Sequence, residues 1–220
     1  HRGERMKKSI IKHYIAGQAN PIKEAMRVME CRAEEILDGN DWYKELYIDP
    51  YVDIVNSHPQ VIQQVKNEIR DFLSVLKKNN INNLLQIGLG HWASTHFVLS
   101  ILLDEVTTLE YDSTHIERYL PEACEGCETI IQGDSLELHK NIEDESFDAV
   151  FIDGNHSYEY VKQDLENYSK KVKSGGIIAL HDANFEGEQY GTPQVLRESE
   201  NEWLFISYSK EVGIAYRIKE

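Results

Sequence analysis

The segment Leu84–Thr95 reads LLQIGLGHWAST, an apolar run followed by a glycine turn and the beginning of a helix. The apolar run predicts a buried β-strand that ends close to Gly88. Gly88 and Gly90 fall where the chain has to turn tightly and where a ligand can approach the backbone. A strand that leads through such a turn into a helix is typical of the first unit of a nucleotide-binding α/β fold. The sequence therefore predicts a ligand site at the carboxyl end of this strand.

Apolar runs and helical patterns alternate through the rest of the chain. The expected strands are 84–88, 106–110, 128–132, 148–152 and 176–181, and the expected helices between them are 92–103, 114–121, 134–141 and 157–172. This alternation predicts right-handed βαβ units and a mostly parallel sheet. A short helix at 193–199 leads to two further strands, 203–208 and 212–218, whose short connection favours an antiparallel hairpin. The fold class is therefore a Rossmann-like, doubly wound α/β sheet.

Residues 6–80 are helical in character and are expected to form an N-terminal cap on the domain at 81–220. Apolar residues recur every three or four positions within 22–37 and within 61–76, as on the buried face of a helix. The aromatic residues of 41–56 could cover a ligand pocket, or they could simply pack within the cap. The apolar helix faces also offer a surface through which two copies of the chain could form a homo-oligomer.

Composition narrows the expected partners. The chain has 38 acidic and 23 basic side chains and a net charge of −15. Such a surface repels phosphate backbones, so a nucleic-acid substrate is not expected. No apolar run approaches the roughly 20 residues of a membrane span, and no signal-peptide pattern is present. Residues 1–5 precede Met6 and are interpreted as a remnant of cloning, so they are left out of the fold prediction.

The three cysteines give no disulfide framework because their number is odd, and a reducing, cytoplasmic location is expected. Cys124 and Cys127 form a C-x-x-C pair, but the chain lacks the second pair that a four-ligand zinc site needs. No functional role is assigned to them.

Polar residues stand where the expected strands end. They are Glu110, Asp134, Asp153 and the pair His181 and Asp182. The carboxyl ends of parallel strands meet at one edge of a sheet, and open α/β folds bind their ligands there. Glu110 lies 22 residues after Gly88, where a carboxylate can accept both hydroxyls of a ribose; the alternative is a solvated acid. Asp134 and Ser135 could bind an adenine amino group, cap the next helix, or do both.

A longer pattern surrounds the fourth and fifth strands. Phe147–Tyr158 reads FDAVFIDGNHSY, and Lys173–Asp182 reads KSGGIIALHD. Together they resemble the Asp-Gly-x-His-x-Tyr … Gly-Gly … His-Asp signature of class I S-adenosylmethionine-dependent methyltransferases. The branch that they resemble most is the small-molecule O-methyltransferase-like group called methyltransferase family 24. The resemblance covers about 84–218 and implies a seven-stranded sheet with a reversed last strand, S-adenosylmethionine as cofactor, and a small-molecule methyl acceptor.

The resemblance also implies positions for the parts of the cofactor. The methionine part would lie over Gly88 and Gly90, the ribose on Glu110, and the adenine beside Asp134. The remaining expected contacts are Ser94, Thr95, Tyr111, Ser135 and Asp153. Gln86 stands where the family usually has an acidic residue; it can form a hydrogen bond with the cofactor's amino group but cannot offset its positive charge.

Besides S-adenosylmethionine, the residues at the ends of the fourth and fifth strands suggest a divalent metal, through a second family resemblance. In the catechol and caffeoyl-coenzyme A methyltransferases, which this stretch also resembles, an Asp, an Asp and an Asn hold a metal; the matching residues here are Asp153, His181 and Asp182. An imidazole ligand shifts the preference from magnesium towards manganese, iron or zinc. Alternatively, His181 is a neutral base or only a hydrogen-bonding strand end.

His156 lies three residues after Asp153 and is the other candidate base, or else an ordinary histidine at the start of a helix. The expected reaction is methyl transfer to a hydroxyl. His156 or His181, beside Asp153, would remove the proton of the hydroxyl, or a bound metal would lower the pKa of the hydroxyl so that the proton is lost more easily. Three alternatives stay open: an NAD-dependent oxidoreductase, a metal-dependent hydroxylase, and a non-catalytic cofactor-binding module. Ala93, which replaces the third glycine of a dinucleotide fingerprint, weighs against the first.

Overall fold

The computed structural model describes most of the chain from residue 64 onward. The described ranges are 64–90, 95–96, 99–100, 103–119, 128–185, 187–210 and 212–220. The predictions made for residues 6–63, for Ser94 and for the two cysteines at 124 and 127 lie outside these ranges, as does most of the helix expected at 92–103. Among the helices of the described part, none combines the length and the apolar character needed to cross a membrane.

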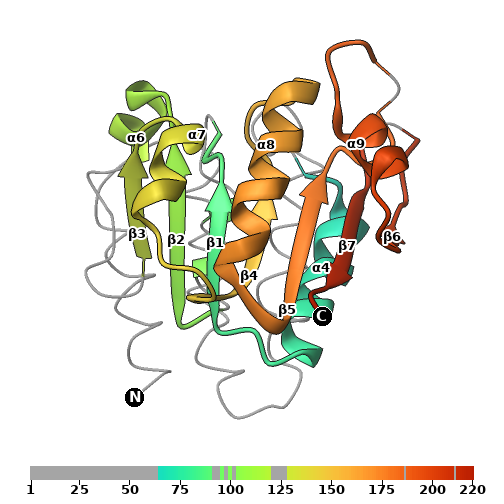
Figure 1. Cartoon of the computed structure of the whole chain (residues 1–220), viewed down its shortest axis with the longest axis horizontal. Helices are drawn as coiled ribbons and strands as arrows, with labels where there is room; N and C mark the ends of the chain where they lie inside the picture. Colours follow the sequence, from blue (N-terminus) through green and yellow to red (C-terminus); the bar gives the residue numbers. More distant parts are fainter. Residues whose placement is uncertain are drawn as a thin grey trace.

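A seven-stranded sheet forms the centre of the molecule, with the strand order β3-β2-β1-β4-β5-β7-β6 (Figure 1). Its strands are β1 Asn83–Ile87, β2 Glu105–Glu110, β3 Glu128–Gln132, β4 Phe147–Ile152, β5 Val172–His181, β6 Leu204–Ile206 and β7 Ile214–Ile218. The first five pair in parallel, and β7 runs antiparallel to both β5 and β6. The predicted Rossmann-like sheet, its reversed last strand and the final hairpin are confirmed.

Helices cover both faces of the sheet (Figure 1). The described helices are α4 Lys66–Lys78, α6 Ser113–Tyr119, α7 Ser135–Leu138, α8 Tyr158–Tyr168 and α9 Thr192–Glu198, with 3-10 turns at His139–Asn141 and Ser169–Lys171. The predicted helices at 134–141 and 157–172 thus each end in a 3-10 turn. Side chains alternate along β4, so Val150 and Ile152 pack in the cluster with Val161 of α8, while Phe151 contacts Phe72 of α4.

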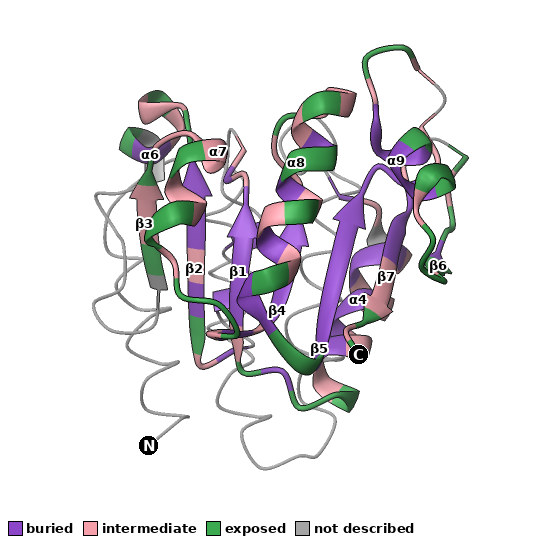
Figure 2. Ribbon diagram, viewed as in Figure 1, coloured by how far each residue is buried: buried purple, intermediate pink, exposed green. Residues whose placement is uncertain are grey.

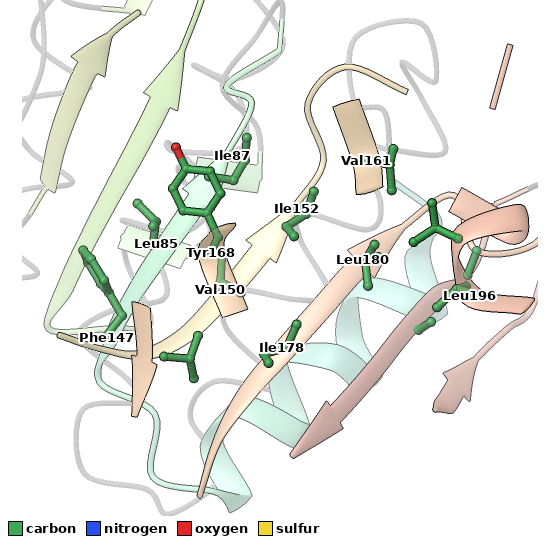
Figure 3. Packing of buried hydrophobic residues seen from close by; sticks show 14 of the residues in the cluster. Leu85, Ile87, Phe147, Val150, Ile152, Val161, Tyr168, Ile178, Leu180 and Leu196 are labelled. Carbon is green, nitrogen blue, oxygen red and sulfur yellow. The ribbon is translucent and has the colours of Figure 1, made fainter. Parts of the chain in front are cut away.

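The central strands are buried on both faces, as expected for parallel strands between two helical layers (Figure 2). Figure 3 shows the main cluster, in which Tyr168 and Val161 of α8 lie against apolar side chains of the strands. The labelled strand residues are Leu85, Ile87, Phe147, Val150, Ile152, Ile178 and Leu180. Because this layer fixes α8 over β1 and β4, the loop that precedes α8 is held at the carboxyl edge of the sheet.

The predicted strand at 203–208 is shorter in the structure because a buried carboxylate takes up its last backbone groups. Glu68 of α4 accepts hydrogen bonds from the backbone N–H groups of Tyr208 (2.7 Å), Ser209 (2.9 Å) and Gly213 (2.9 Å). The N–H groups at 208 and 209 therefore turn to the helix and not to a neighbouring strand. This carboxylate anchors α4 to the hairpin formed by β6 and β7.

Candidate active site

The glycine turn brings the carboxyl ends of three strands together. Gly88 has a φ of +93°, and a Cβ atom there would lie 2.1 Å from the carbonyl oxygen of Asp153, so only glycine fits. The Gly88 N–H donates to the carbonyl of Leu109, and the Asp153 N–H donates to the carbonyl of Ile87. The turn after β1 is thus bonded to the ends of β2 and β4.

Glu110 is buried below this turn and is already partly occupied. Its Oε2 accepts from the N–H groups of Leu89 (2.8 Å) and Gly90 (3.2 Å), and its Oε1 accepts from the Asp112 N–H (2.8 Å). A carboxylate has about four acceptor positions. Nδ1 of His115 also lies 3.4 Å from Oε2, so Oε1 is the oxygen with an unused acceptor position, and the predicted contact with a ribose stays a prediction.

Gln86 is buried and faces the interior of the molecule. Its Nε2 donates to the Gly88 carbonyl at 2.7 Å, and its Oε1 faces the Thr108 hydroxyl at 3.5 Å. Thr108 in turn lies 2.7 Å from Nδ1 of His96. Both ends of the amide are directed to the protein, so Gln86 supports the turn, and its contact with a cofactor amino group stays a prediction. Thr95, another expected contact, is buried as well.

The residues expected around an adenine lie at the ends of β2 and β3. Tyr111 follows Glu110 with a ring that is 77% exposed, so one aromatic face is available for stacking. Asp134 caps α7 because its side chain accepts from the Leu136 N–H at 2.9 Å, which confirms the capping alternative. Its second carboxylate oxygen is not used by the cap and can accept from a ligand.

Asp153, His181 and Asp182 meet at the ends of β4 and β5, as predicted. Nδ1 of His181 lies 3.1 Å from Oδ1 of Asp153 and 3.3 Å from Oδ1 of Asp182. One ligand atom from each residue lies within 4.8 Å of the others. Asp182 has a φ of +56°, a left-handed conformation that an aspartate tolerates better than most residues. This backbone directs its carboxylate back to the histidine.

The two carboxylates of Asp153 and Asp182 favour a positive charge between them. Burial alone would lower the pKa of His181, but the charges of Asp153 and Asp182 raise it well above its usual value. Burial likewise opposes the ionisation of Asp153, yet His181 brings the pKa of that carboxyl below its usual value. Neither ring nitrogen completes a well-directed hydrogen bond within the described part of the chain. Two carboxylates around one imidazole nitrogen therefore suit either a proton on His181 or a divalent metal in its place.

This result weakens one of the predicted roles of His181. A histidine that holds its proton tightly is a poor base near neutral pH. His156 is better placed for proton transfer because its side chain is 39% exposed and its Nε2 lies 3.4 Å from Oδ2 of Asp182 and 3.9 Å from Oδ1 of Asp153. The convergence of His156 with the cluster is as the sequence predicted.

The loop after β5 packs against His156. The His156 ring stacks on Tyr190 with centroids 4.8 Å apart, and Tyr190 stacks on Phe185 at 3.8 Å. The Gly191 N–H donates to the His156 carbonyl at 2.7 Å. Phe185 and Tyr190 thus form an aromatic wall beside this histidine.

Gln64, just before α4, is a site residue that the sequence did not reveal. Its Nε2 donates to Oδ2 of Asp153 at 3.1 Å, across 89 positions of the chain. The side chain is buried, and its Oε1 has no hydrogen-bond partner among the described residues. The sequence signal that could have revealed Gln64 is its place as a polar residue beside the apolar stripe at 61–76. Glu68 carries the same signal.

The comparisons with known proteins agree with this geometry. A family model described as "Methyltransferase domain" matches residues 85–183, which span β1 to the end of β5. No curated protein matches the sequence.

Three solved structures show that the fold recurs at low sequence identity. A Staphylococcus aureus protein assigned provisionally as a caffeoyl-CoA O-methyltransferase is 18% identical with a TM-score of 0.59, covering 89% of this chain and 99% of its own. An O-methyltransferase from Bacillus cereus with SAH bound is 19% identical with a TM-score of 0.55, covering 91% and 100%. An rRNA methylase from Streptococcus thermophilus is 12% identical with a TM-score of 0.54, covering 71% and 98%.

Proposed function

We propose that this chain, an S-adenosylmethionine-dependent methyltransferase by its domain at 85–183, methylates a hydroxyl group of a small-molecule acceptor. The observation that carries the proposal is the cluster of Asp153, His181 and Asp182 beside His156, at the same sheet edge as the glycine turn. A site that can hold both a cation and a proton acceptor suits an acceptor whose proton has to be removed. Two of the similar structures are described as O-methyltransferases, which favours the same reading.

When bound, S-adenosylmethionine supplies a methyl group activated by its sulfonium. The chain has to align that group with the acceptor and exclude water. The glycine turn at Gly88 and Gly90 leaves space beside the backbone for the methionine part, and Glu110 retains capacity for a ribose hydroxyl. The exposed ring of Tyr111 suits an adenine, as does the Asp134 oxygen that the helix cap does not use and that accepts one long hydrogen bond from Tyr160. Thus three strand ends would hold the donor along the sheet edge.

His156 would receive the proton of the acceptor hydroxyl as the oxygen attacks the methyl carbon. The carbon–sulfur bond breaks in the same step, and the sulfur leaves as a neutral thioether. The carboxylates of Asp182 and Asp153 lie close enough to stabilise the imidazolium that forms on His156. The stacked ring of Tyr190 limits the rotation of His156 and so keeps its Nε2 at this position.

The donor set of Asp153, His181 and Asp182 fits a divalent metal, which would lower the pKa of a coordinated hydroxyl. An imidazole between two carboxylates favours manganese, iron or zinc over magnesium. His181 would have to lose its proton to act as a ligand. Gln64 would then orient Asp153 through its hydrogen bond to Oδ2.

One of the similar structures is an rRNA methylase, so a nucleic-acid acceptor has to be considered. The rRNA methylase shares the fold, but the net charge of −15 on this chain repels a phosphate backbone. We therefore propose a small-molecule acceptor. The methyltransferase family match also favours methyl transfer over the hydride transfer of an NAD-dependent oxidoreductase.

The direct test measures donor binding and turnover separately. Calorimetry with S-adenosylhomocysteine should show binding, and incubation of the chain with S-adenosylmethionine and a panel of phenols, sugars and amines should yield a methylated hydroxyl compound. His156→Ala should reduce turnover by about 100-fold or more, while the affinity for S-adenosylhomocysteine stays within about twofold. Absence of binding by the folded chain would refute the proposed donor. Methylated amines alone would refute the proposed acceptor.

A further inference from the structure

Three residues of α8 contact the turn that precedes α7. Tyr160, Asp164 and Tyr168 are spaced by four positions and therefore share one face of the helix. The Tyr160 hydroxyl donates to Oδ2 of Asp134 at 3.4 Å, and the Tyr168 hydroxyl donates to the Ser135 carbonyl at 2.6 Å. Asp164, one turn from each tyrosine, faces the Ser135 hydroxyl and the Asp134 carboxylate. We call these three residues the α8 stripe.

Asp164 is the unusual member of the stripe. It is only 1% exposed, and neither of its carboxyl oxygens completes a well-directed hydrogen bond among the described residues. Burial, and to a smaller extent the charge of Asp134, raise its pKa to about 7, although the Ser135 hydroxyl acts in the opposite direction. The titratable groups that face it are Asp134 on α7 and the two tyrosines of its own helix, and no cation in the described part of the chain offsets its charge.

The protonation of Asp164 decides whether the stripe supports the turn. In the protonated form its O–H can donate to Ser135 or to Asp134, so all three residues of the stripe bond to the turn. In the ionised form two carboxylates face each other in a buried place, and they repel. Asp134 and Ser135 are the residues that the proposed function assigns to the adenine of the donor. Covering this cluster with a bound adenine would bury it further and make ionisation still more costly.

We infer that Asp164 is a positioning residue for the adenine of the donor, and that it holds the Gly133–Ser135 turn in place only while it carries a proton. This inference rests on the proposed function, because Asp134 and Ser135 contact an adenine only if the donor is S-adenosylmethionine. Donor affinity should therefore fall as the pH rises through neutrality. The turnover number at a saturating donor concentration should not be affected.

The test is the affinity for S-adenosylhomocysteine, measured by calorimetry at about pH 6.5 and about pH 8.5. Wild-type affinity should fall by roughly 3- to 25-fold, the range expected when a group of pKa about 7 loses its proton and binding raises that pKa by half a unit or more. Asp164→Asn imitates the neutral acid, so it should bind at both pH values as the wild type does at the lower one. Glu166→Gln, an exposed position on the same helix, removes the same charge and should behave like the wild type.

Turnover provides a second measurement that distinguishes positioning from a general structural role. At high pH, Asp164→Asn should lower the KM for S-adenosylmethionine relative to the wild type and leave kcat unchanged. Equal pH dependence of binding in the wild type and in Asp164→Asn would overturn the inference, as would a wild-type affinity that does not change with pH. No binding by any folded variant at either pH would instead refute the proposed donor.

Tyr168→Phe keeps the inference testable if Asp164→Asn does not fold. Removal of the bond to the Ser135 carbonyl should weaken S-adenosylhomocysteine binding about 3- to 10-fold at both pH values. It should leave the pH dependence intact, because Asp164 is still present. Unchanged affinity in Tyr168→Phe would show that the stripe does not position the turn.

Discussion

Replacement of Glu68 by Gln tests how α4 is joined to the rest of the fold. The fully buried carboxylate accepts three backbone hydrogen bonds, from Tyr208, Ser209 and Gly213. In Glu68→Gln the amide oxygen can keep the first two as neutral bonds, each weaker by about 1 kcal/mol than a bond to a charged group. The amide nitrogen would face the Gly213 N–H, donor against donor, which leaves a buried N–H unpaired at a cost of about 1–3 kcal/mol.

These contributions sum to about 3–5 kcal/mol, and the lower cost of burying an amide than a carboxylate reduces the expected loss to about 2–4 kcal/mol. Such a loss is a large part of the 5–15 kcal/mol that stabilises a typical domain. Urea unfolding followed by circular dichroism should show the midpoint shifted down with an unchanged slope. Gln64 lies just before α4 and bonds to Asp153, so loosening α4 should disturb Asp153. We therefore expect turnover to fall more than the affinity for the donor.

The matched control is Asp71→Asn on the same helix. Asp71 accepts a single, exposed hydrogen bond from the Tyr208 hydroxyl, so its loss should cost less than about 1 kcal/mol. If Glu68→Gln and Asp71→Asn destabilise the chain equally, the buried carboxylate does not anchor the helix and the reasoning is wrong.

Three further changes address the site and its pH response. Gly88→Ala forces a Cβ atom against the Asp153 carbonyl, so we expect the free energy of unfolding to fall by more than about 3 kcal/mol. Calorimetry should also show that this variant no longer binds S-adenosylhomocysteine. Binding as tight as that of the wild type would contradict the geometry of the turn. Gln64→Leu removes a hydrogen bond to Asp153 and should weaken manganese binding about tenfold in a calorimetric titration, whereas the exposed Gln194→Leu should not. The pKa of Asp164 is raised by burial from its usual 3.8 to about 7, so the folded chain binds a proton there that the unfolded chain releases. The free energy of unfolding should therefore fall as pH rises from about 4 to 7, by up to about 1.4 kcal/mol per pH unit, and Asp164→Asn should remove this part of the fall in urea titrations at several pH values. Identical pH profiles for the two proteins would be inconsistent with a raised pKa.

The residues at the strand ends could be predicted from the sequence because backbone geometry alone brings them together. A parallel sheet places all its carboxyl ends at one edge, so a strand boundary known to within a residue or two is enough to predict that Asp153, His181 and Asp182 converge. The hairpin was predicted from the hydrophobic period and the short connection between its strands, with no side-chain detail. The reversed last strand of a seven-stranded sheet was implied by the family resemblance.

The details that the sequence did not reveal all depend on side-chain direction or on distant packing. Gln86 is on a predicted strand next to the turn, but whether its amide points outward or inward follows from the position of Thr108 on the neighbouring strand. Gln64 reaches Asp153 only because α4 packs on the far face of the sheet in one particular register. His181 was predicted as a base or a ligand, and its raised pKa follows from distances to two carboxylates that no spacing rule gives.

The backbone hydrogen bonds at the sheet edge explain how the backbone of the site can stay in place while its side chains differ between proteins of this fold. The first N–H after each of β1, β3 and β4 donates to a carbonyl at the end of a neighbouring strand: Gly88 to Leu109, Gly133 to Glu110, and Asp153 to Ile87. The ladder therefore continues past the ends of these strands and helps to fix the Cα positions of the site. Apart from Gly88, where only glycine fits, side chains beside this ladder can be exchanged without breaking its backbone bonds, so a histidine can stand at position 181 where related patterns have an aspartate. This separation is consistent with the same fold in structures that are only 12–19% identical to this chain. It also implies that substitutions at Asp153, His181 or Asp182 should change metal preference and turnover far more than they change the free energy of unfolding.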